Sequence, residues 1–480
     1  MTQQTLVIDF ETYYDQGFSL SKLTTEEYIR HEMFEAIGVS VKCNDEPAVW
    51  FSGSKAQTKR WLGQWDWDGA VAVAHNAMFD MAILNWHFDI SPKRIADTLS
   101  MARAIDGPDA GNSLAKLAER YGLGVKGNEV INALNKGRLD FTNEELERYG
   151  RYCINDAEIT YKLFARLAPL LPPKEMRLID MTIRMFSEPV LELDESALCE
   201  HLEDIKAKKA GLMEAVAVDR SVLMSNPQLA ELLRTLGVVP PTKISPTTGK
   251  ETWAFGKTDE GFKALLEHPN PGVQAVIAAR MGVKSTLEET RTERFIGIAG
   301  RGSLPIPLRY YAAHTGRFGG DDKINMQNLP RGSALKRAVL APEGCVLIDC
   351  DSSQIEARIL AWLAGQDDLV EAFASGEDIY RLMASRIYAV GTEEVDKNQR
   401  FVGKTTILGC GYGMGPPKFK SQLASFGVDT SMTTCRLVIG VYRDTYDRIP
   451  ELWDEADRAL DALQQQRTSS LGRDGVLVVD

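Results

Sequence analysis

Residues 346–365 read VLIDCDSSQIEARILAWLAG, a stretch in which an apolar run leads into two aspartates. The apolar residues before Asp349 and Asp351 predict a strand that is buried in a core, and small polar residues and a second apolar run follow. Burial of a carboxylate is costly unless a positive group compensates it. A bound metal ion, a neighbouring cation and an exposed strand end all remain open as explanations for the two aspartates.

The composition is that of an ordinary globular protein. Of its 480 residues, 44% are hydrophobic and 25% are charged. This length allows roughly two to four domains. No apolar run is long enough to span a bilayer, and the start, MTQQTLVIDFETYY, lacks the basic region of a signal peptide. The seven cysteines are scattered without a CxxC pair, which disfavours a zinc ribbon and favours the reducing cytoplasm.

The charge distribution is uneven. The net charge of −12 by itself disfavours a nucleic-acid coat protein or a basic arm. Residues 301–340, however, carry seven Lys or Arg against two Asp. Because the local field decides whether a surface contacts phosphate, this segment is either a solvated basic loop or a grip for nucleic acid.

Hydrophobic periodicity predicts an α/β N-terminal third followed by mostly helical segments. Thr142 and Glu145 form a capping-box pattern at the start of a long helix, and the sequence LPP at 171–173 breaks that helix and marks a domain boundary. The predicted elements are a strand at 5–11, a hairpin at 36–51, a strand at 70–76, a long helix at 142–171, a helical arm at 174–300 with a looped tip at 238–258, a basic loop, strand and helices from 301 to about 466, and a final turn and strand.

Three segments of the N-terminal third carry carboxylates at spacings that allow them to converge. Residues two apart on a strand share a face, and residues four apart on a helix lie one turn apart. Each pattern alone is usually structural, but their order and spacing together are specific. The set comprises Asp9 and Glu11 on a strand, Asn76, Phe79 and Asp80 at a strand-to-helix junction, and Tyr152 and Asp156 on a helix.

Four converging carboxylates repel one another in a low dielectric unless divalent cations lie between them. Oxygen ligands suit Mg²⁺ or Mn²⁺. Two such ions roughly 4 Å apart are the arrangement for phosphodiester hydrolysis, in which one activates water and the other stabilises the leaving oxygen.

In this order and spacing, the set resembles the DEDDy 3′–5′ exonuclease superfamily, which has an RNase H-like fold. The resemblance implies that two metal ions are held by Asp9, Glu11, Asp80 and Asp156. It further implies that Tyr152 orients the attacking water, and that Asn76 and Phe79 contact the terminal nucleotide or support the site.

Residues 400–415 read RFVGKTTILGCGYGMG. Positions four residues apart, which form a stripe on a helix, carry Arg400, Lys404, Leu408 and Tyr412. Two cations one turn apart can hold a triphosphate, although an amphipathic helix with a glycine-rich end is the ordinary alternative. The GKTT at 403–406 does not form a P-loop motif, because position 398 is Asn rather than Gly and no apolar strand precedes it.

The segments DSSQIEAR and RxxxKxxxxGxxYG resemble motifs A and B of family A DNA polymerases, the polymerase I group. Further agreement lies in TGR (315–317), NMQNLP (325–330), LKRAVLAPEG (335–344) and FASGEDIYRLMASRIY (373–388). The resemblance implies an exonuclease domain at 1–171, a helical thumb at 172–300, the first part of the palm at 301–364, fingers at 365–466 with the motif B helix at about 398–412, and the start of the later palm at 467–480.

The same resemblance implies addition of dNTPs to the primer 3′-OH of primer-template DNA, with two Mg²⁺ or Mn²⁺ ions at each active site. Asp351 would bind a palm metal, and Lys404 would also protonate the leaving pyrophosphate. Arg317 would reach the primer end through the minor groove. The implied dNTP-binding residues are Gln354, Glu356, Arg400, Lys404, Leu408 and Tyr412.

The chain departs from the family pattern at several positions. Ser352 replaces a tyrosine of motif A, Leu408 replaces an aromatic residue of motif B, and Tyr380 replaces a histidine. The His-Asp-Glu hairpin that carries the second palm carboxylate is missing, since all six histidines precede motif A. A truncated palm, a second chain that completes it and an exonuclease without polymerase activity therefore remain open.

The compact layout is similar to that of bacteriophage replicative polymerases. It implies a role in DNA replication in the cytoplasm of a bacterial or phage-infected cell. A processivity factor or a helicase would be a further partner, and no membrane is expected.

Overall fold

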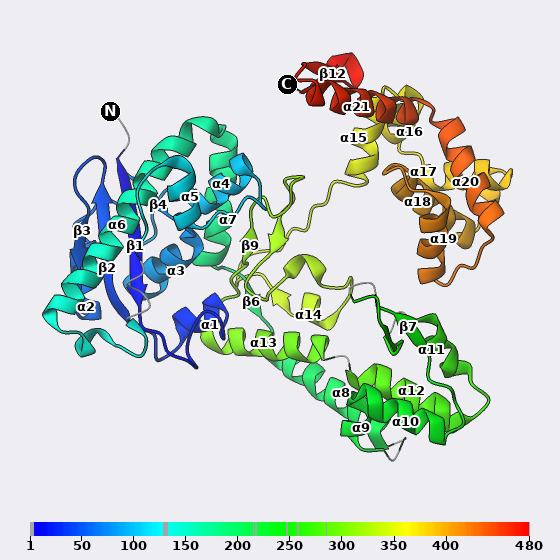
Figure 1. Cartoon of the computed structure of the whole chain (residues 1–480), viewed down its shortest axis with the longest axis horizontal. Helices are drawn as coiled ribbons and strands as arrows, with labels where there is room; N and C mark the ends of the chain where they lie inside the picture. Colours follow the sequence, from blue (N-terminus) through cyan, green and yellow to red (C-terminus); the bar gives the residue numbers. More distant parts are fainter. Residues whose placement is uncertain are drawn as a thin grey trace. The chain divides into compact units, whose positions relative to one another are not determined.

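The computed structural model describes residues 4–127, 133–214, 216, 218–245, 248–256, 259–284 and 286–479. It divides into two compact units, Met1–Leu347 and Ile348–Asp480 (Figure 1). The first combines a five-stranded sheet with helices, and the second is almost entirely helical, which confirms the predicted α/β and α fold class. Among the described helices, none has both the length and the apolar character needed to cross a bilayer.

The sheet of the first unit has β1 at its centre, in the strand order β3-β2-β1-β4-β5. β2 runs antiparallel to β1, β4 runs parallel to β1, and β5 runs parallel to β4. The strands predicted at 5–11 and 70–76 are confirmed as β1 and β4, and the hairpin predicted at 36–51 is confirmed as β2 and β3. The strands are β1 (Thr5–Thr12), β2 (Ala36–Cys43), β3 (Val49–Phe51), β4 (Val71–Ala74) and β5 (Ile95–Asp97).

Side chains of β1 alternate between two cores on opposite faces of the sheet. Leu6, Ile8 and Phe10 pack in the core that contains most of the buried residues of α3. Val7 packs in the other core, with residues of α5 and α6. Asp9 and Glu11 share the face of Val7, so they point toward α6. The helices around the sheet are α1 (Thr25–Arg30), α2 (Lys55–Leu62), α3 (Ala77–Phe88), α4 (Thr98–Asp106), α5 (Leu114–Tyr121), α6 (Asn143–Leu167) and α7 (Pro173–Ser187).

The long helix α6 begins at the predicted capping box. Thr142 Oγ1 accepts from the Glu145 backbone N–H at 3.2 Å, and Glu145 accepts from the Thr142 backbone N–H at 2.9 Å. After the break near residue 171, α7 packs against α3 and β5 and adds Ile183 and Phe186 to the core on that side. Packing around the sheet therefore continues past the predicted domain boundary.

The rest of the first unit is a helical arm and a base of short strands, in which α8 and α13 pack against each other (Figure 1). The β7–β8 hairpin lies within the predicted looped tip. The helices are α8 (Glu195–Glu214), α9 (Arg220–Met224), α10 (Asn226–Thr235), α11 (Glu260–Ala264), α12 (Pro271–Lys284), α13 (Leu287–Arg301) and α14 (Ala334–Arg337). The strands are β6 (Glu192–Leu193), β7 (Thr242–Ile244), β8 (Glu251–Trp253), β9 (Leu308–Arg309), β10 (Gly319–Gly320) and β11 (Val339–Leu340).

Helix α1 joins this arm to the sheet within the first unit. The fully buried Glu26 accepts two hydrogen bonds from Arg301, at 2.9 and 2.7 Å. Asp322 accepts from the Thr25 backbone N–H at 2.5 Å, at the N-terminal end of the helix. A buried carboxylate with a bidentate arginine is well compensated, so these contacts fix α1 between the two parts.

The second unit is a cluster of helices around one apolar core, with a short hairpin formed by β12 and β13. In this unit α17 and α18 cross closely at Gly403, where an added Cβ would lie 2.2 Å from the Tyr380 carbonyl oxygen. The elements are α15 (Ile355–Ala364), α16 (Asp367–Ala374), α17 (Ile379–Tyr388), α18 (Lys397–Cys410), α19 (Pro416–Ser425), α20 (Met432–Thr445), α21 (Arg448–Gln464), β12 (Ser469–Leu471) and β13 (Leu477–Val479).

The prediction of a buried strand before Asp351 is wrong. Residues 345–352 form neither strand nor helix, and the side chains of Val346 and Ile348 are each 81% exposed. A strand needs a hydrogen-bonded neighbour, and no strand of the described residues pairs with this segment. Asp349 and Asp351 therefore lie on an exposed segment and not at the end of a buried strand.

The motif B helix is shorter than the predicted 398–412. α18 ends at Cys410, and Tyr412 lies in the turn that follows. Gly413 in this turn has a φ of 69°, in the left-handed region that favours glycine.

Candidate functional site

Four acidic residues from three elements converge beside the centre of the sheet. Asp9 and Glu11 lie on β1, Asp80 lies in the first turn of α3, and Asp156 lies on α6. A bulge in the β1–β2 ladder directly after Glu11 changes the direction of the strand end. The residue before α3, Asn76, has a φ of 71°, which turns the chain sharply from β4 into the helix.

Hydrogen bonds between elements hold three of the carboxylates. Asp9 accepts from the Cys153 thiol at 3.2 Å, Glu11 accepts from the Tyr149 hydroxyl at 2.6 Å, and Asp80 accepts from the Phe10 backbone N–H at 3.0 Å. The first two donors belong to α6 and the third to β1. These contacts therefore fix β1 against α6 and against α3.

Burial and mutual repulsion raise the pKa values of these carboxyl groups. Burial, followed by the charge of Asp156, raises the pKa of Asp9 to about 7. Burial, followed by the charge of Asp9, raises the pKa of Glu11 and that of Asp80 well above their usual values. The arrangement is therefore electrostatically unfavourable for four ionised carboxylates unless positive charge is added.

Lys126 and Tyr152 complete the acidic cluster. The Lys126 ammonium forms an ion pair with Asp156 and lies 4.9 Å from the centre of the Tyr152 ring. Burial, together with the charge of Asp156, raises the pKa of Tyr152 above its usual value. The phenol of Tyr152 therefore stays protonated at neutral pH and is available as a hydrogen-bond donor.

The donor set fits a divalent cation. Among the described residues, Asp9, Glu11 and Cys153 offer ligand atoms that all lie within 4.8 Å of one another. Asp80 and Asp156 adjoin this group, since each interacts electrostatically with Asp9. Mg²⁺ and Mn²⁺ prefer carboxylate oxygens as ligands. A bound cation would also relieve the repulsion between these carboxylates.

A cavity of about 600 Å³ adjoins the acidic cluster and is rich in hydrogen-bond donors. Burial lowers the pKa of His75 in its wall to about 4, so this imidazole is neutral at pH 7. The predicted residue Asn76 lines the cavity, whereas Phe79 packs with Tyr28, at a ring-centre distance of 6.2 Å. The polar lining residues include His75, Asn76, Arg103, Asn112, Lys126 and Arg309.

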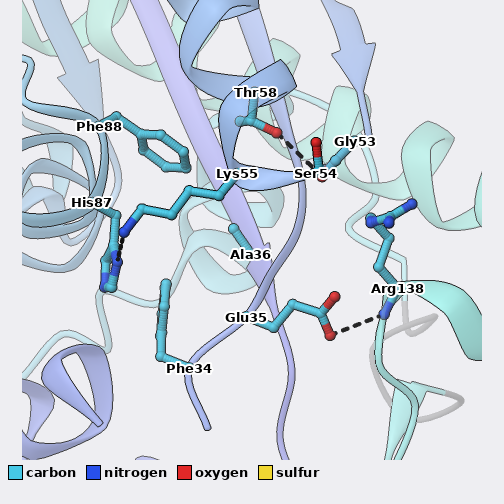
Figure 2. A pocket seen from close by; sticks show the side chains of 10 residues that line it. All are labelled: Phe34, Glu35, Ala36, Gly53, Ser54, Lys55, Thr58, His87, Phe88 and Arg138. Atoms are coloured by element: carbon cyan, nitrogen blue, oxygen red, sulfur yellow. Dashed lines mark hydrogen bonds between the residues drawn. The ribbon is translucent and has the colours of Figure 1, made fainter. Parts of the chain in front are cut away.

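A second cavity, of about 300 Å³, lies between the start of β2 and helices α2 and α3 (Figure 2). Lys55 and His87 approach each other on one side, with Nζ 3.1 Å from Nδ1, and Glu35 accepts from the Arg138 backbone N–H on the other side at 3.1 Å. Neither the four clustered carboxylates nor Lys126 and Tyr152 line this cavity, so it is separate from the acidic site.

Sequence reasoning did not identify Tyr149, Cys153, Lys126 or Asp97 as parts of the site. Asp97 caps α4 and accepts from the Asn76 backbone N–H at 2.8 Å, so it supports the turn into α3. Tyr149 and Cys153 share a face of α6 with Asp156, and this spacing is the one signal that was present in the sequence. Nothing in the local sequence marks Lys126 or Asp97.

In the second unit, three predicted nucleotide-binding residues meet in one cavity. Glu356, Leu408 and Tyr412 line an apolar cavity of about 220 Å³ between α15 and the end of α18. Gln354, with a φ of 56°, immediately precedes α15. The exposed fraction of Tyr412 is 66%, so much of its ring faces solvent.

The other predicted polymerase residues are exposed or bound to neighbours. Arg400 donates to Asp378 at 2.7 Å, and its guanidinium lies 5.3 Å from the centre of the Tyr380 ring. Asp351 and Lys404 are exposed in the second unit, and Arg317 is exposed in the first. Among the described residues, contacts therefore link the acidic-site residues more fully than they link the predicted polymerase residues.

Comparison with known proteins agrees with both parts of the chain. Residues 193–477 match the family model described as DNA polymerase family A. The chain belongs to this family. Residues 63–172 match the model described as 3′-5′ exonuclease, so this family A chain carries an exonuclease domain that includes Asp80, Tyr152 and Asp156.

Bacterial DNA polymerases I are among the relatives of this family A chain. DNA polymerase I of Pseudomonas aeruginosa is 27% identical over 399 residues, which cover 78% of the chain and 42% of the relative. The thermostable DNA polymerase I of Thermus aquaticus is 34% identical over 185 residues, or 36% of the chain and 22% of the relative. The chain thus spans about two fifths or less of the length of these curated relatives.

A solved structure shares the fold. It is described as the POL domain of Pol1 from M. smegmatis in complex with DNA primer-template and dNTP. The alignment has a TM-score of 0.65 at 20% identity and covers 98% of this chain and 77% of that one.

Proposed function

We propose that this family A chain is a DNA-directed DNA polymerase with a 3′–5′ proofreading exonuclease. The observation that carries the exonuclease assignment is the convergence of four buried or half-buried carboxylates from β1, α3 and α6. The proposed residues of that site are Asp9, Glu11, Asp80, Tyr152 and Asp156. The proposed reaction is hydrolysis of the terminal phosphodiester of a DNA 3′ end.

The exonuclease residues have different roles, which follow from their positions and their protonation states. Asp9 and Glu11, with Asp80 and Asp156 beside them, would hold Mg²⁺ or Mn²⁺. When bound there, a divalent cation would activate a water and would stabilise charge on the leaving oxygen. The protonated phenol of Tyr152 orients the water, and the donor-rich cavity beside Asn76 receives the terminal nucleotide.

For polymerisation, the proposed substrates are dNTPs and primer-template DNA. Arg400 and Lys404 bind the triphosphate, and Lys404 protonates the pyrophosphate that leaves. Asp351 would hold a metal ion. Glu356, Leu408 and Tyr412 border the incoming nucleotide together with Gln354, a role that their shared cavity supports for the first three. Arg317 and the basic segment 301–340 contact the DNA backbone and primer end.

A second candidate is an exonuclease that lacks polymerase activity on its own. The exonuclease residues lie within one unit and contact one another, whereas Asp351 is exposed on an irregular segment. In this case a second chain would supply the remaining palm carboxylate. The chain would then be one part of a split polymerase.

The exonuclease proposal is tested with a 5′-labelled primer that carries a mismatched 3′ tail on a template. With Mg²⁺ and no dNTPs, we expect the unaltered chain to shorten the primer, and Asp9→Ala and Asp156→Ala to lose this activity by orders of magnitude. Asp45→Ala, in the exposed turn between β2 and β3, is the matched control and should remain active. Degradation that persists in both site variants would refute the assignment.

The polymerase proposal is tested separately with the Asp9→Ala chain, a matched primer-template and dNTPs. We expect the Asp9→Ala chain to extend the primer. Adding Lys404→Ala or Asp351→Asn to that chain should abolish the extension. Absence of extension by the Asp9→Ala chain, where the unaltered chain shortens the mismatched primer, would favour the second candidate.

A further inference from the structure

The face of α6 that meets β1 carries more than the residues proposed for catalysis. Tyr149, Cys153 and Asp156 occupy positions i, i+4 and i+7 of this helix, so they form one stripe. The Tyr149 hydroxyl donates to Glu11 Oε2 at 2.6 Å, and the Cys153 thiol donates to Asp9 Oδ2 at 3.2 Å. Each strand carboxylate thus has one oxygen occupied by a donor from α6.

We propose that Tyr149 and Cys153 are positioning residues of the exonuclease site, which fix Glu11 and Asp9 so that the opposite carboxylate oxygens are presented to the metal. This inference rests on the proposed exonuclease function. It assigns α6 a second role, because the helix that supplies Asp156 and Tyr152 also orients the two ligands on β1.

Packing holds the Tyr149 hydroxyl in place. The side chain is 3% exposed, and its ring stacks with Phe141 at 5.5 Å and with Tyr152 at 6.2 Å between ring centres. The Trp50 ring lies edge-on at 6.4 Å. Surrounded in this way, the phenol cannot swing away from Glu11 without disturbing the aromatic cluster, so the hydrogen bond is preorganised.

Glu11 requires such support because of its place in the strand. The β1–β2 register shifts directly after Glu11, so the regular ladder does not continue past this residue. Bulges of this kind change the direction of a side chain. A glutamate has three rotatable bonds, and a fixed donor at its Oε2 restricts them to the rotamer that faces Asp9.

Cys153 acts on Asp9 from the next turn of α6. Its thiol is fully buried, within 3.2 Å of both the backbone oxygen and Oδ2 of Asp9, and Ser40 Oγ lies 3.3 Å away. Because S–H is a weak donor, we expect a smaller contribution from Cys153 than from Tyr149.

The test compares metal binding and catalysis by the full chain and four variants. Tyr149→Phe removes only the hydroxyl, and Tyr161→Phe is the matched control on the same helix, where the hydroxyl donates to the exposed Asp45 at 2.9 Å. Cys153→Ala removes the thiol donor, and Cys153→Ser restores a donor. Mn²⁺ affinity is measured by electron paramagnetic resonance, with the KM for Mg²⁺ and for DNA as further readouts.

We expect Tyr149→Phe to weaken Mn²⁺ binding by about tenfold, as for the loss of a hydrogen bond to a charged group. Cys153→Ala should weaken it by about two- to threefold, the range of a weak donor. Cys153→Ser and Tyr161→Phe should bind Mn²⁺ as the unaltered chain does. The KM for Mg²⁺ should rise in parallel, while the KM for DNA stays unchanged.

The proposal is overturned if Tyr149→Phe lowers the melting temperature but leaves Mn²⁺ affinity unchanged, because the tyrosine would then serve packing alone. It is also overturned if Tyr161→Phe has the same effect as Tyr149→Phe. An unaltered chain that binds Mn²⁺ in an Asp9-dependent manner but degrades no DNA would refute the exonuclease function, while the effect of Tyr149→Phe on affinity would still support the positioning role.

Discussion

The ammonium group of Lys126 forms an ion pair with Asp156, and the same group lies over the ring of Tyr152. Its charge also opposes the rise in the pKa values of Asp9 and Glu11 that burial causes. Lys126 therefore supplies part of the positive charge that the clustered carboxylates require. A divalent cation at the same carboxylates would compete with this ammonium.

Substitution of Lys126 by methionine should therefore tighten metal binding. With the competing charge removed, we expect Lys126→Met to bind Mn²⁺ about fivefold more tightly, which corresponds to roughly 1 kcal/mol. Titration followed by electron paramagnetic resonance measures this affinity. Lys162→Met, on the exposed side of α6, is the control and should leave it unchanged. Weaker binding by Lys126→Met would mean that the lysine supports the metal ligands instead of competing for them.

The raised pKa of Asp9 predicts how stability depends on pH in the presence of a chelator. Between its usual value of 3.8 and about 7, the folded protein holds a proton on Asp9 that the unfolded chain releases. The free energy of unfolding therefore falls as the pH rises through this range. Glu11 and Asp80 act in the same direction, since their pKa values are also raised. We expect the melting temperature followed by circular dichroism to be higher at pH 5 than at pH 8.

A variant at Asp80 checks that this dependence comes from the acidic cluster. Asp80→Asn removes one charge but keeps an oxygen that can accept from the Phe10 backbone N–H. It should raise the melting temperature at pH 8 and reduce the difference between pH 5 and pH 8. Addition of Mg²⁺ at pH 8 should stabilise the unaltered chain by mass action. An unaltered chain that is more stable at pH 8 than at pH 5 would contradict the raised pKa values of Asp9, Glu11 and Asp80.

The acidic site could be predicted where its geometry is local. Alternation along a strand places Asp9 and Glu11 on one face, and the helical turn does the same for Tyr152 and Asp156. Tyr149 could not be assigned because its partner, Glu11, comes from a distant part of the chain that only the fold brings close. Lys126 lies outside any regular pattern, so its place beside Asp156 depends on tertiary structure alone.

The strand predicted before Asp351 shows where a local sequence pattern is insufficient. An apolar run indicates that a segment can form a strand, but the strand forms only where a neighbouring strand completes its hydrogen bonds. The exposed side chains of Val346 and Ile348 reflect this dependence. Likewise, the four-residue stripe predicted through Tyr412 stops earlier, because α18 ends at Cys410 in a glycine-rich turn.

Gly403 in the GKTT segment is explained by helix packing. A Cβ at this position would lie 2.2 Å from the Tyr380 oxygen and 3.0 Å from the Ala384 nitrogen, both backbone atoms of α17. Gly403→Ala should therefore force α17 and α18 apart and destabilise the protein by about 1–3 kcal/mol, measured by urea unfolding. Gly440→Ala is the control, since nothing lies within 4 Å of its Cβ and α20 should gain up to about 1 kcal/mol. Equal effects of the two variants would exclude the close crossing.

The capping box of α6 should affect stability without affecting the chemistry of the site. Thr142 and Glu145 satisfy backbone N–H groups at the start of the helix that carries Tyr149, Tyr152 and Asp156. Thr142→Ala should lower stability by about 1 kcal/mol, seen as a lower melting temperature, whereas Thr142→Ser should retain the cap. At 25 °C both variants should bind Mn²⁺ as the unaltered chain does, because the packing of α6 on β1 holds the site once the protein is folded. A loss of Mn²⁺ affinity in Thr142→Ala that exceeds its unfolded fraction would show instead that the helix end controls the position of the metal ligands.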